Sequence, residues 1–239
     1  METNWTIPTS DGHKIYGVKN ASSEKQAKQA IFIVHGLTGH INEYALKRAA
    51  EYFSPEYDVY RFSLYVGEEG ARSLVDCTIQ THADDLNAVL DAFADSYEKV
   101  FLIGHSYGGA TVMMANPEKI TSVSLWDPSF NLNDIQQEFI PIGDHYIYGS
   151  GVSSLLGKDM YEEAGRLDGD ACVKLAQDFK HPVQVVHAAN GWYIKRGDSY
   201  HSFNKNSRYD VVEGTVHCFY EGNTCDDLLQ KTESWFKQF

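Results

Sequence analysis

The chain has 239 residues, 43% of them hydrophobic and 22% charged, which is typical of a globular protein with one sizeable core. Its 33 acidic residues outnumber 20 basic ones, the formal net charge is −13, and no basic run offsets the excess. This charge excludes nucleic acid and anionic membrane surfaces as expected partners. We expect a single domain over residues 1–239, and the sequence indicates no particular oligomeric state.

The first twelve residues have neither the basic start nor the apolar segment of a signal peptide. No stretch of the sequence approaches the roughly 18 apolar residues of a membrane span. We therefore expect a cytoplasmic protein without an integral membrane segment. The cysteines lack C-x-x-C spacing, which predicts reduced thiols. They are Cys77, Cys172, Cys218 and Cys225.

The first hundred residues alternate between strand-like and helix-like patterns. In chain order the predicted elements are two short strands within 5–18, a buried strand at 31–34, a helix at 42–53, a strand at 59–65 and a helix at 78–93. The strand at 31–34 ends in the loop HGLTG, residues 35–39. His82 has polar neighbours in the sequence, so we expect it at the surface.

The stretch KVFLIGHSYGG, residues 99–109, carries the strongest chemical signal. Its apolar run at 100–103 predicts a strand buried on both faces of a parallel sheet. The G-x-S-x-G that follows, on a tight strand-to-helix turn, presents the Ser106 hydroxyl at the edge of the sheet. The free N–H groups at the start of the next helix favour negative charge beside it. This pattern predicts Ser106 as a nucleophile.

The second half of the chain contains fewer regular patterns. Its predicted elements are a strand at 123–126, strands at 183–187 and 208–213, and an amphipathic helix at 226–239. The residues between the first two strands, 129–180, have no clear strand pattern. A segment of this length is seldom structureless in a compact domain, so we expect helices that form a cap over the site. The alternative is a helical excursion away from the site.

Three motifs together resemble the α/β-hydrolase fold family: IFIVHG at 31–36, GHSYGG at 104–109 and VEGTVHCF at 212–219. The resemblance covers most of the chain. It implies an α/β fold, a mostly parallel eight-stranded sheet flanked by helices, and an activity like that of serine carboxylesterases and lipases. The loop at 35–39 also resembles that of cinnamoyl and feruloyl esterases. The loop at 66–73 departs from the G-x-G-x-S pattern common in the family, which argues against transferring the substrate of any subfamily.

The resemblance also implies roles for individual residues. The N–H groups of Leu37 and Tyr107 match the oxyanion hole, two fixed donors that stabilise the negative charge of a tetrahedral intermediate. His217, on a loop after the last strand, matches the general base. The alternative for His217 is a buried structural histidine.

The acid that should orient His217 is ambiguous. The family usually places it just after the strand that ends near His187, but the chain reads Ala-Ala-Asn-Gly at 188–191. Asp198 lies farther along the same loop. Asp127, at the end of the preceding strand, stands where some lipases of the family keep their acid. Asn190 is a third candidate, since an amide can orient an imidazole but cannot stabilise its charge.

We therefore expect a hydrolase that cleaves small carboxylic esters through an acyl-enzyme on Ser106, without metal or cofactor. Tyr146, Tyr148 and Trp192 are candidates for an aromatic substrate pocket. A thioesterase or amidase would use the same machinery. A binding protein that kept the fold and lost the reaction is the alternative from another class, supported by the missing acid after residue 186.

Overall fold

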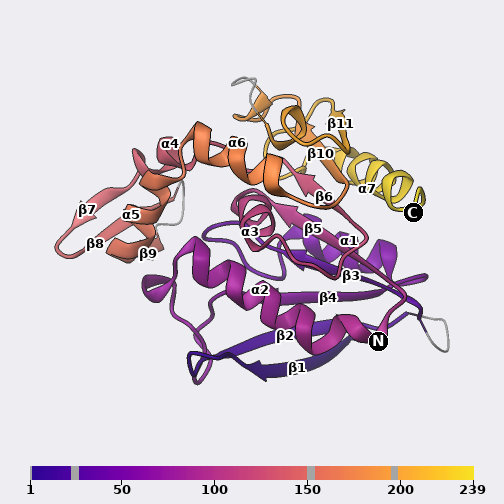
Figure 1. The fold of residues 1–239 in the computed structure, drawn as a ribbon, viewed down its shortest axis with the longest axis horizontal. Coiled ribbons are helices and arrows are strands. Elements are labelled where there is room, and N and C mark those ends of the chain that lie inside the picture. The colour runs from indigo at the N-terminus through magenta and orange to yellow at the C-terminus, as the bar shows by residue number, and fades with distance from the viewer. Residues whose placement is uncertain (1, 23–26, 150–153, 195–198) are drawn as a thin grey trace.

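The computed structural model describes residues 2–22, 27–149, 154–194 and 199–239 (Figure 1). Within these residues, eight strands form one sheet in the order β1-β2-β4-β3-β5-β6-β10-β11. The β1–β2 and β2–β4 pairs are antiparallel, and the other neighbours are parallel. The strands are β1 (Glu2–Pro8), β2 (Lys14–Asn20), β3 (Gln29–Val34), β4 (Asp58–Ser63), β5 (Lys99–His105), β6 (Ser122–Trp126), β10 (Val183–Ala188) and β11 (Ser207–Val212). The expected sheet is confirmed.

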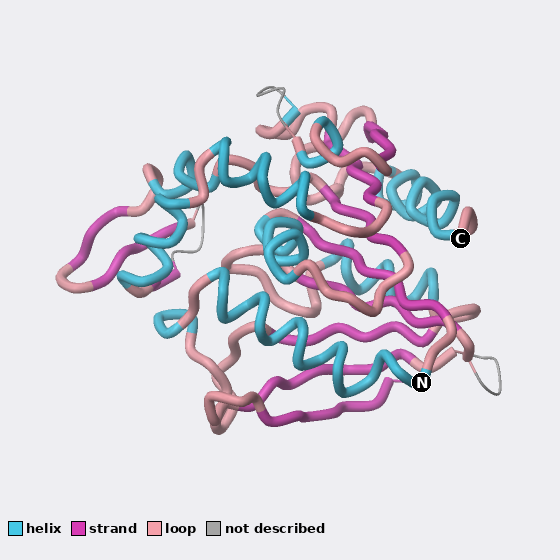
Figure 2. Tube along the Cα trace, viewed as in Figure 1, coloured by secondary structure: helices cyan, strands magenta, loops and turns pink. Residues whose placement is uncertain are grey.

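Helices cover both faces of this sheet, and strand β3 shows why. Its side chains alternate between the faces: Phe32 and Val34 belong to one buried cluster, and Ile31 and Ile33 belong to the other. The first cluster includes residues of α2 (Ile79–Phe93), α3 (Tyr107–Ala115) and α6 (Gly169–Asp178), and the second includes residues of α1 (Tyr44–Phe53) and α7 (Thr224–Phe236). In Figure 2, α2 and α3 cross in front of the sheet. The 3-10 turns described are η1 (Leu74–Asp76), η2 (Ala94–Ser96) and η4 (Tyr200–Ser202).

The segment between β6 and β10 carries elements of its own. They are α4 (Leu132–Gln136), β7 (Ile140–Ile142), β8 (His145–Tyr148), β9 (Ser154–Leu156), α5 (Lys158–Arg166) and α6. The three strands form a small antiparallel sheet that stands out at the left of Figure 1. The expected helices are present, but the strands were not predicted, because runs of three or four residues are too short to show alternation. That this segment acts as a cap stays a prediction.

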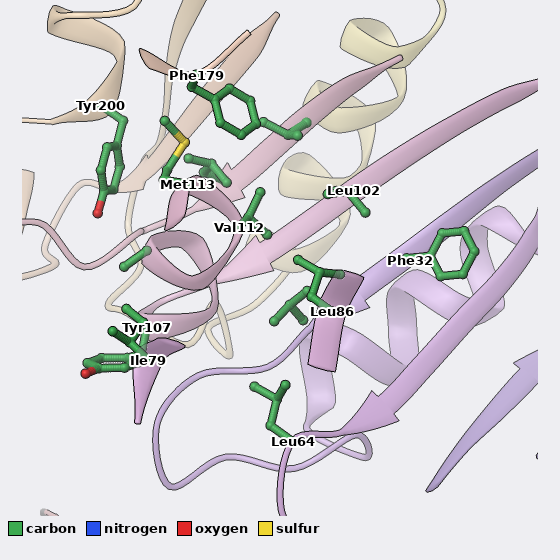
Figure 3. Close-up of a cluster of buried hydrophobic side chains, with 14 of the residues drawn as sticks. Phe32, Leu64, Ile79, Leu86, Leu102, Tyr107, Val112, Met113, Phe179 and Tyr200 are labelled. Atoms are coloured by element: carbon green, nitrogen blue, oxygen red, sulfur yellow. The ribbon is translucent and has the colours of Figure 1, made fainter. Parts of the chain in front are cut away.

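This insertion is joined to the body of the molecule through α2 and α3. The Glu163 carboxylate of α5 accepts hydrogen bonds from the N–H groups of Ile79 and Gln80, which open α2. The Tyr107 hydroxyl of α3 lies 3.2 Å from the sulfur of Met160. Figure 3 shows the buried cluster beneath, in which α3 packs with residues of α2, β3 and β5.

His82 corrects one expectation. It is buried on the inner face of α2, beside the rings of Tyr65 and Tyr107, and within the described residues neither ring nitrogen has a partner. Burial lowers the pKa of His82 to about 3, so the ring is neutral. The polar sequence neighbours misled the prediction, because on a helix the residues three and four positions away share its face. Among the residues that the structure describes, none of the helices qualifies as a membrane span.

Candidate active site

Ser106 occupies the turn between β5 and α3 with a positive φ, at φ 56° and ψ −123°. A non-glycine residue is strained in this region and persists only where its surroundings hold it. Three backbone hydrogen bonds do so: the Ser106 N–H donates to Trp126 O at 3.0 Å, and its carbonyl accepts from Gly109 and Ser129, each at 2.9 Å. The turn is therefore fixed before any substrate arrives.

The small residues around Ser106 allow three elements to meet. A Cβ atom on Gly108 would lie 2.5 Å from the Val34 carbonyl oxygen and 2.6 Å from that of His35. A Cβ atom on Gly104 would lie 2.8 Å from the Gly108 carbonyl oxygen. A side chain at either position would push α3 away from β3 and β5, which is the physical reason for the G-x-S-x-G spacing.

The predicted oxyanion donors lie on the two sides of Ser106. Tyr107 opens α3 and Leu37 follows β3, and both line the cavity that contains Ser106. Within the described residues, neither N–H donates to a protein acceptor. His35 braces the loop before Leu37: one ring nitrogen lies 2.8 Å from the Gly36 carbonyl oxygen, and the other accepts from the Leu64 N–H at 3.1 Å. Burial lowers the pKa of His35, which keeps this ring neutral.

Asp127, directly after β6, lies against His217. Its Oδ2 is 2.6 Å from His217 Nδ1, and the Asp127 side chain is fully buried. Burial would raise the pKa of Asp127, but hydrogen bonds from His187 and His217 outweigh it and lower this pKa to about 2. The carboxylate is therefore ionised and can orient the His217 ring and stabilise its charged form.

His217 sits on the loop after β11 and remains partly open to the cavity, with 22% of its side chain exposed. Burial lowers its pKa below the usual value, although Asp127 opposes the shift. The ring of His105 packs against it at 4.8 Å between centroids, and His105 Nε2 lies 3.0 Å from the His217 carbonyl oxygen. His217 is consequently neutral near pH 7, as a general base must be.

The other two candidates for the acid lie elsewhere or are not described. Asp198 lies outside the described residues. The Asn190 side chain is exposed. The backbone N–H of Asn190 donates to the Thr215 carbonyl, which ties the loop after β10 to the loop that carries His217. Asp127 is the candidate that the structure places against the imidazole.

A cavity of about 700 Å³ opens over Ser106 and His217. Tyr148 and Trp192 line it, and the Trp192 ring is stacked near that of His217 at 6.1 Å. Tyr146 is not among the described lining residues: its ring stacks on Tyr161 at 4.0 Å, within the insertion. Because alternate residues of a strand point to opposite sides, Tyr146 shares the side of β8 that Tyr148 occupies, but Tyr146 packs within the insertion.

Sequence reasoning missed two charged or titratable neighbours of the site. His187, the penultimate residue of β10, bonds the second oxygen of Asp127 at 2.7 Å. Glu43 lines the cavity, and its Oε2 lies 3.8 Å from His105 Nδ1. A polar side chain at the carboxyl end of an otherwise buried strand was the available signal for His187.

Comparisons with known proteins agree with this fold. Residues 25–141 match the family model described as serine aminopeptidase, S33. The structure resembles Est1E from Butyrivibrio proteoclasticus, with 18% identity over 98% of this chain and 99% of that chain and a TM-score of 0.78. It also resembles the esterase domain of a Rhodothermus marinus protein, with 16% identity over 100% and 98% of the chains and the same TM-score. The protein has the α/β-hydrolase fold.

Est1E with bound ferulic acid is a further match to this α/β-hydrolase fold, at 16% identity over 99% of this chain and 94% of that chain, with a TM-score of 0.76. A search of curated sequences found no match. The resemblance drawn from the three motifs is thereby confirmed, and the comparisons support a hydrolase. At these identities the structural matches establish the fold, not the substrate.

Proposed function

We propose that the protein is a serine hydrolase that cleaves carboxylic esters. Ser106 Oγ attacks the ester carbonyl while His217 takes its proton, and the Leu37 and Tyr107 N–H groups bind the resulting oxyanion. His217 then gives the proton to the leaving alcohol, and an acyl-enzyme forms on Ser106. Water, activated by His217, releases the acid and restores the serine. Asp127 orients His217 and stabilises its imidazolium form throughout.

One observation carries the proposal: the buried Asp127 carboxylate lies 2.6 Å from Nδ1 of a histidine that shares a cavity with a serine on a strained turn. Within the described residues, the Ser106 hydroxyl makes no hydrogen bond. This is compatible with catalysis, because such bonds often tighten only when substrate binds.

The cavity favours uncharged aromatic or short acyl esters. Tyr148 and Trp192 offer flat apolar surface, whereas Glu43 and Glu138 contribute negative charge, and no lysine or arginine is among the described lining residues. A free carboxylate on the substrate would meet like charge in a partly desolvated site. The ferulic acid bound to Est1E supports an ester of an aromatic carboxylic acid as the first substrate to try.

A series of p-nitrophenyl esters of increasing chain length tests this function. We expect turnover by the wild type, a loss of several orders of magnitude in Ser106→Ala, and a fall in kcat on the order of 10⁴-fold in Asp127→Asn. Asp198→Asn is the matched control and should keep wild-type rates. Loss in Asp198→Asn with retention in Asp127→Asn would reverse the assignment of the acid, and no turnover of any ester would refute the esterase.

Amide hydrolysis is the second candidate, because the matching family model is described as serine aminopeptidase. The same variants assayed on aminoacyl p-nitroanilides separate the two, because an amidase hydrolyses these anilides in a Ser106-dependent reaction and an esterase leaves them uncleaved. The third candidate, a non-catalytic binding protein, relied on the lack of an acid after β10. The contact between Asp127 and His217 removes much of that support.

A further inference from the structure

A second histidine meets the carboxylate that faces His217. His187 Nδ1 lies 2.7 Å from Asp127 Oδ1, while His217 Nδ1 lies 2.6 Å from Oδ2. The side chains of His187 and Asp127 are 2% and 0% exposed, so water does not compete for these bonds. One buried carboxylate thus joins two imidazole rings, one from β10 and one from the loop after β11.

The chemistry of the carboxylate fixes the direction of its bond with His187. An ionised carboxylate only accepts hydrogen bonds, so Nδ1 of His187 carries the proton and donates it to Asp127. On the other side of the ring, Nε2 lies 3.2 Å from the Ser199 hydroxyl oxygen. Both nitrogens of the His187 ring therefore have a partner. The Ala188 N–H makes a longer contact of 3.4 Å with Asp127 Oδ1, the oxygen that His187 also contacts.

We propose that His187 is a positioning residue of this active site: it holds the Asp127 carboxylate with Oδ2 toward His217 and withdraws part of its negative charge. The inference rests on the proposed function for its kinetic consequences. Without the His187 donor, Oδ1 would be a buried acceptor without its strongest partner, and the carboxylate would be free to turn about its terminal bond. The undivided charge would also favour the imidazolium form of His217.

The other titratable groups near His187 do not change this balance near neutral pH. Tyr209 of β11 packs against the ring at 5.8 Å, and His201 of η4 packs against Tyr209 at 4.2 Å. Burial raises the pKa of Tyr209 and lowers that of His201, which leaves both uncharged. The titratable groups that reach Asp127 are therefore the two histidines it contacts, with His105 and Glu43 beyond His217.

Two substitutions separate positioning from packing. His187→Leu removes the donor at similar volume, whereas His187→Asn keeps an N–H at the same number of bonds from Cα as Nδ1. For ester hydrolysis we expect kcat to fall ~10- to 100-fold in His187→Leu with KM unchanged, and to recover most of this loss in His187→Asn. The acid limb of kcat/KM should move to higher pH in the leucine variant alone. Thermal unfolding of both variants checks that they are folded.

A second readout does not depend on turnover. Low-field proton NMR of the folded enzyme should show the N–H protons of both imidazoles bonded to Asp127, with one lost in His187→Leu and the His217 proton titrating at higher pH. An inactive wild type would refute the esterase but leave this test of His187 standing. An unchanged His217 titration in His187→Leu, or equal kinetic losses in both variants, would overturn the positioning role.

Discussion

Asp127 has a positive φ of 39°, and its charged side chain is fully buried. Both features cost free energy, and an aspartate that only ended a strand would need neither. The Asp127 N–H donates to the Val186 carbonyl at 2.8 Å, and its two carboxylate oxygens receive the two histidines. A Cβ atom on Gly191 would lie 2.8 Å from Oδ2, so the loop after β10 also leaves room for this side chain. The backbone strain is thus compensated by contacts that aim the carboxylate at His217.

The pKa shifts of His217 and Asp127 predict how kcat/KM depends on pH. His217 acts as a base only when neutral, and its pKa lies below the ~6.5 of a free imidazole, so kcat/KM should be flat near neutral pH and fall on acidification with a midpoint below that value. Asp127, with a pKa of about 2, stays ionised over this range. A pH series with p-nitrophenyl butyrate measures the midpoint.

Glu43 provides the control for this pH profile. Its negative charge favours the imidazolium form of His217, so Glu43→Gln should move the midpoint to lower pH. A wild-type midpoint above pH 7, or a shift to higher pH in Glu43→Gln, would contradict the electrostatic account of the site.

Among the elements, α2 shows how the insertion is attached to the body. Thr78 and Thr81 form a reciprocal capping box at the start of α2. Between them, the N–H groups of Ile79 and Gln80 donate to the Glu163 carboxylate of α5. The insertion thus supplies the acceptor for two N–H groups that have no partner within the helix. Glu163→Ala should lower the free energy of unfolding by about 1–2 kcal/mol. It should also increase proteolytic cleavage within residues 129–180.

Glu163→Gln is the matched variant, because the amide keeps an acceptor oxygen but loses the charge that favours the helix N-terminus. Urea unfolding should place it between the wild type and Glu163→Ala. If Glu163→Ala unfolded at the wild-type urea concentration, the contact would not be what joins the insertion to α2.

The sequence predicted the parts of the site that depend on local pattern. The apolar run before Ser106, the glycines around it and the loop before Leu37 are each contiguous in the chain, and the structure places them as expected. Choosing Asp127 as the candidate acid depends on which strands are neighbours. Asp127 and His187 are sixty residues apart in the chain, and only the parallel pairing of β6 with β10 brings them together. No local pattern contains that information.

At the scale of the whole molecule, the site is assembled from the carboxyl ends of β3, β5, β6 and β10 and the loop after β11. Ser106, Leu37, Asp127 and His217 come from four segments that meet because parallel strands end at one edge of the sheet. The insertion between β6 and β10 contributes Tyr148 to the cavity from the side. The arrangement of the proposed catalytic residues therefore depends on the complete fold.

Reaction with a fluorophosphonate, followed by mass spectrometry of the intact chain and its peptides, tests the catalytic reading most directly. We expect one covalent phosphonyl group per chain, on Ser106, with no labelling of Ser106→Ala and much slower labelling of Asp127→Asn. An unlabelled Ser106 at high probe concentration in the folded wild type would contradict it.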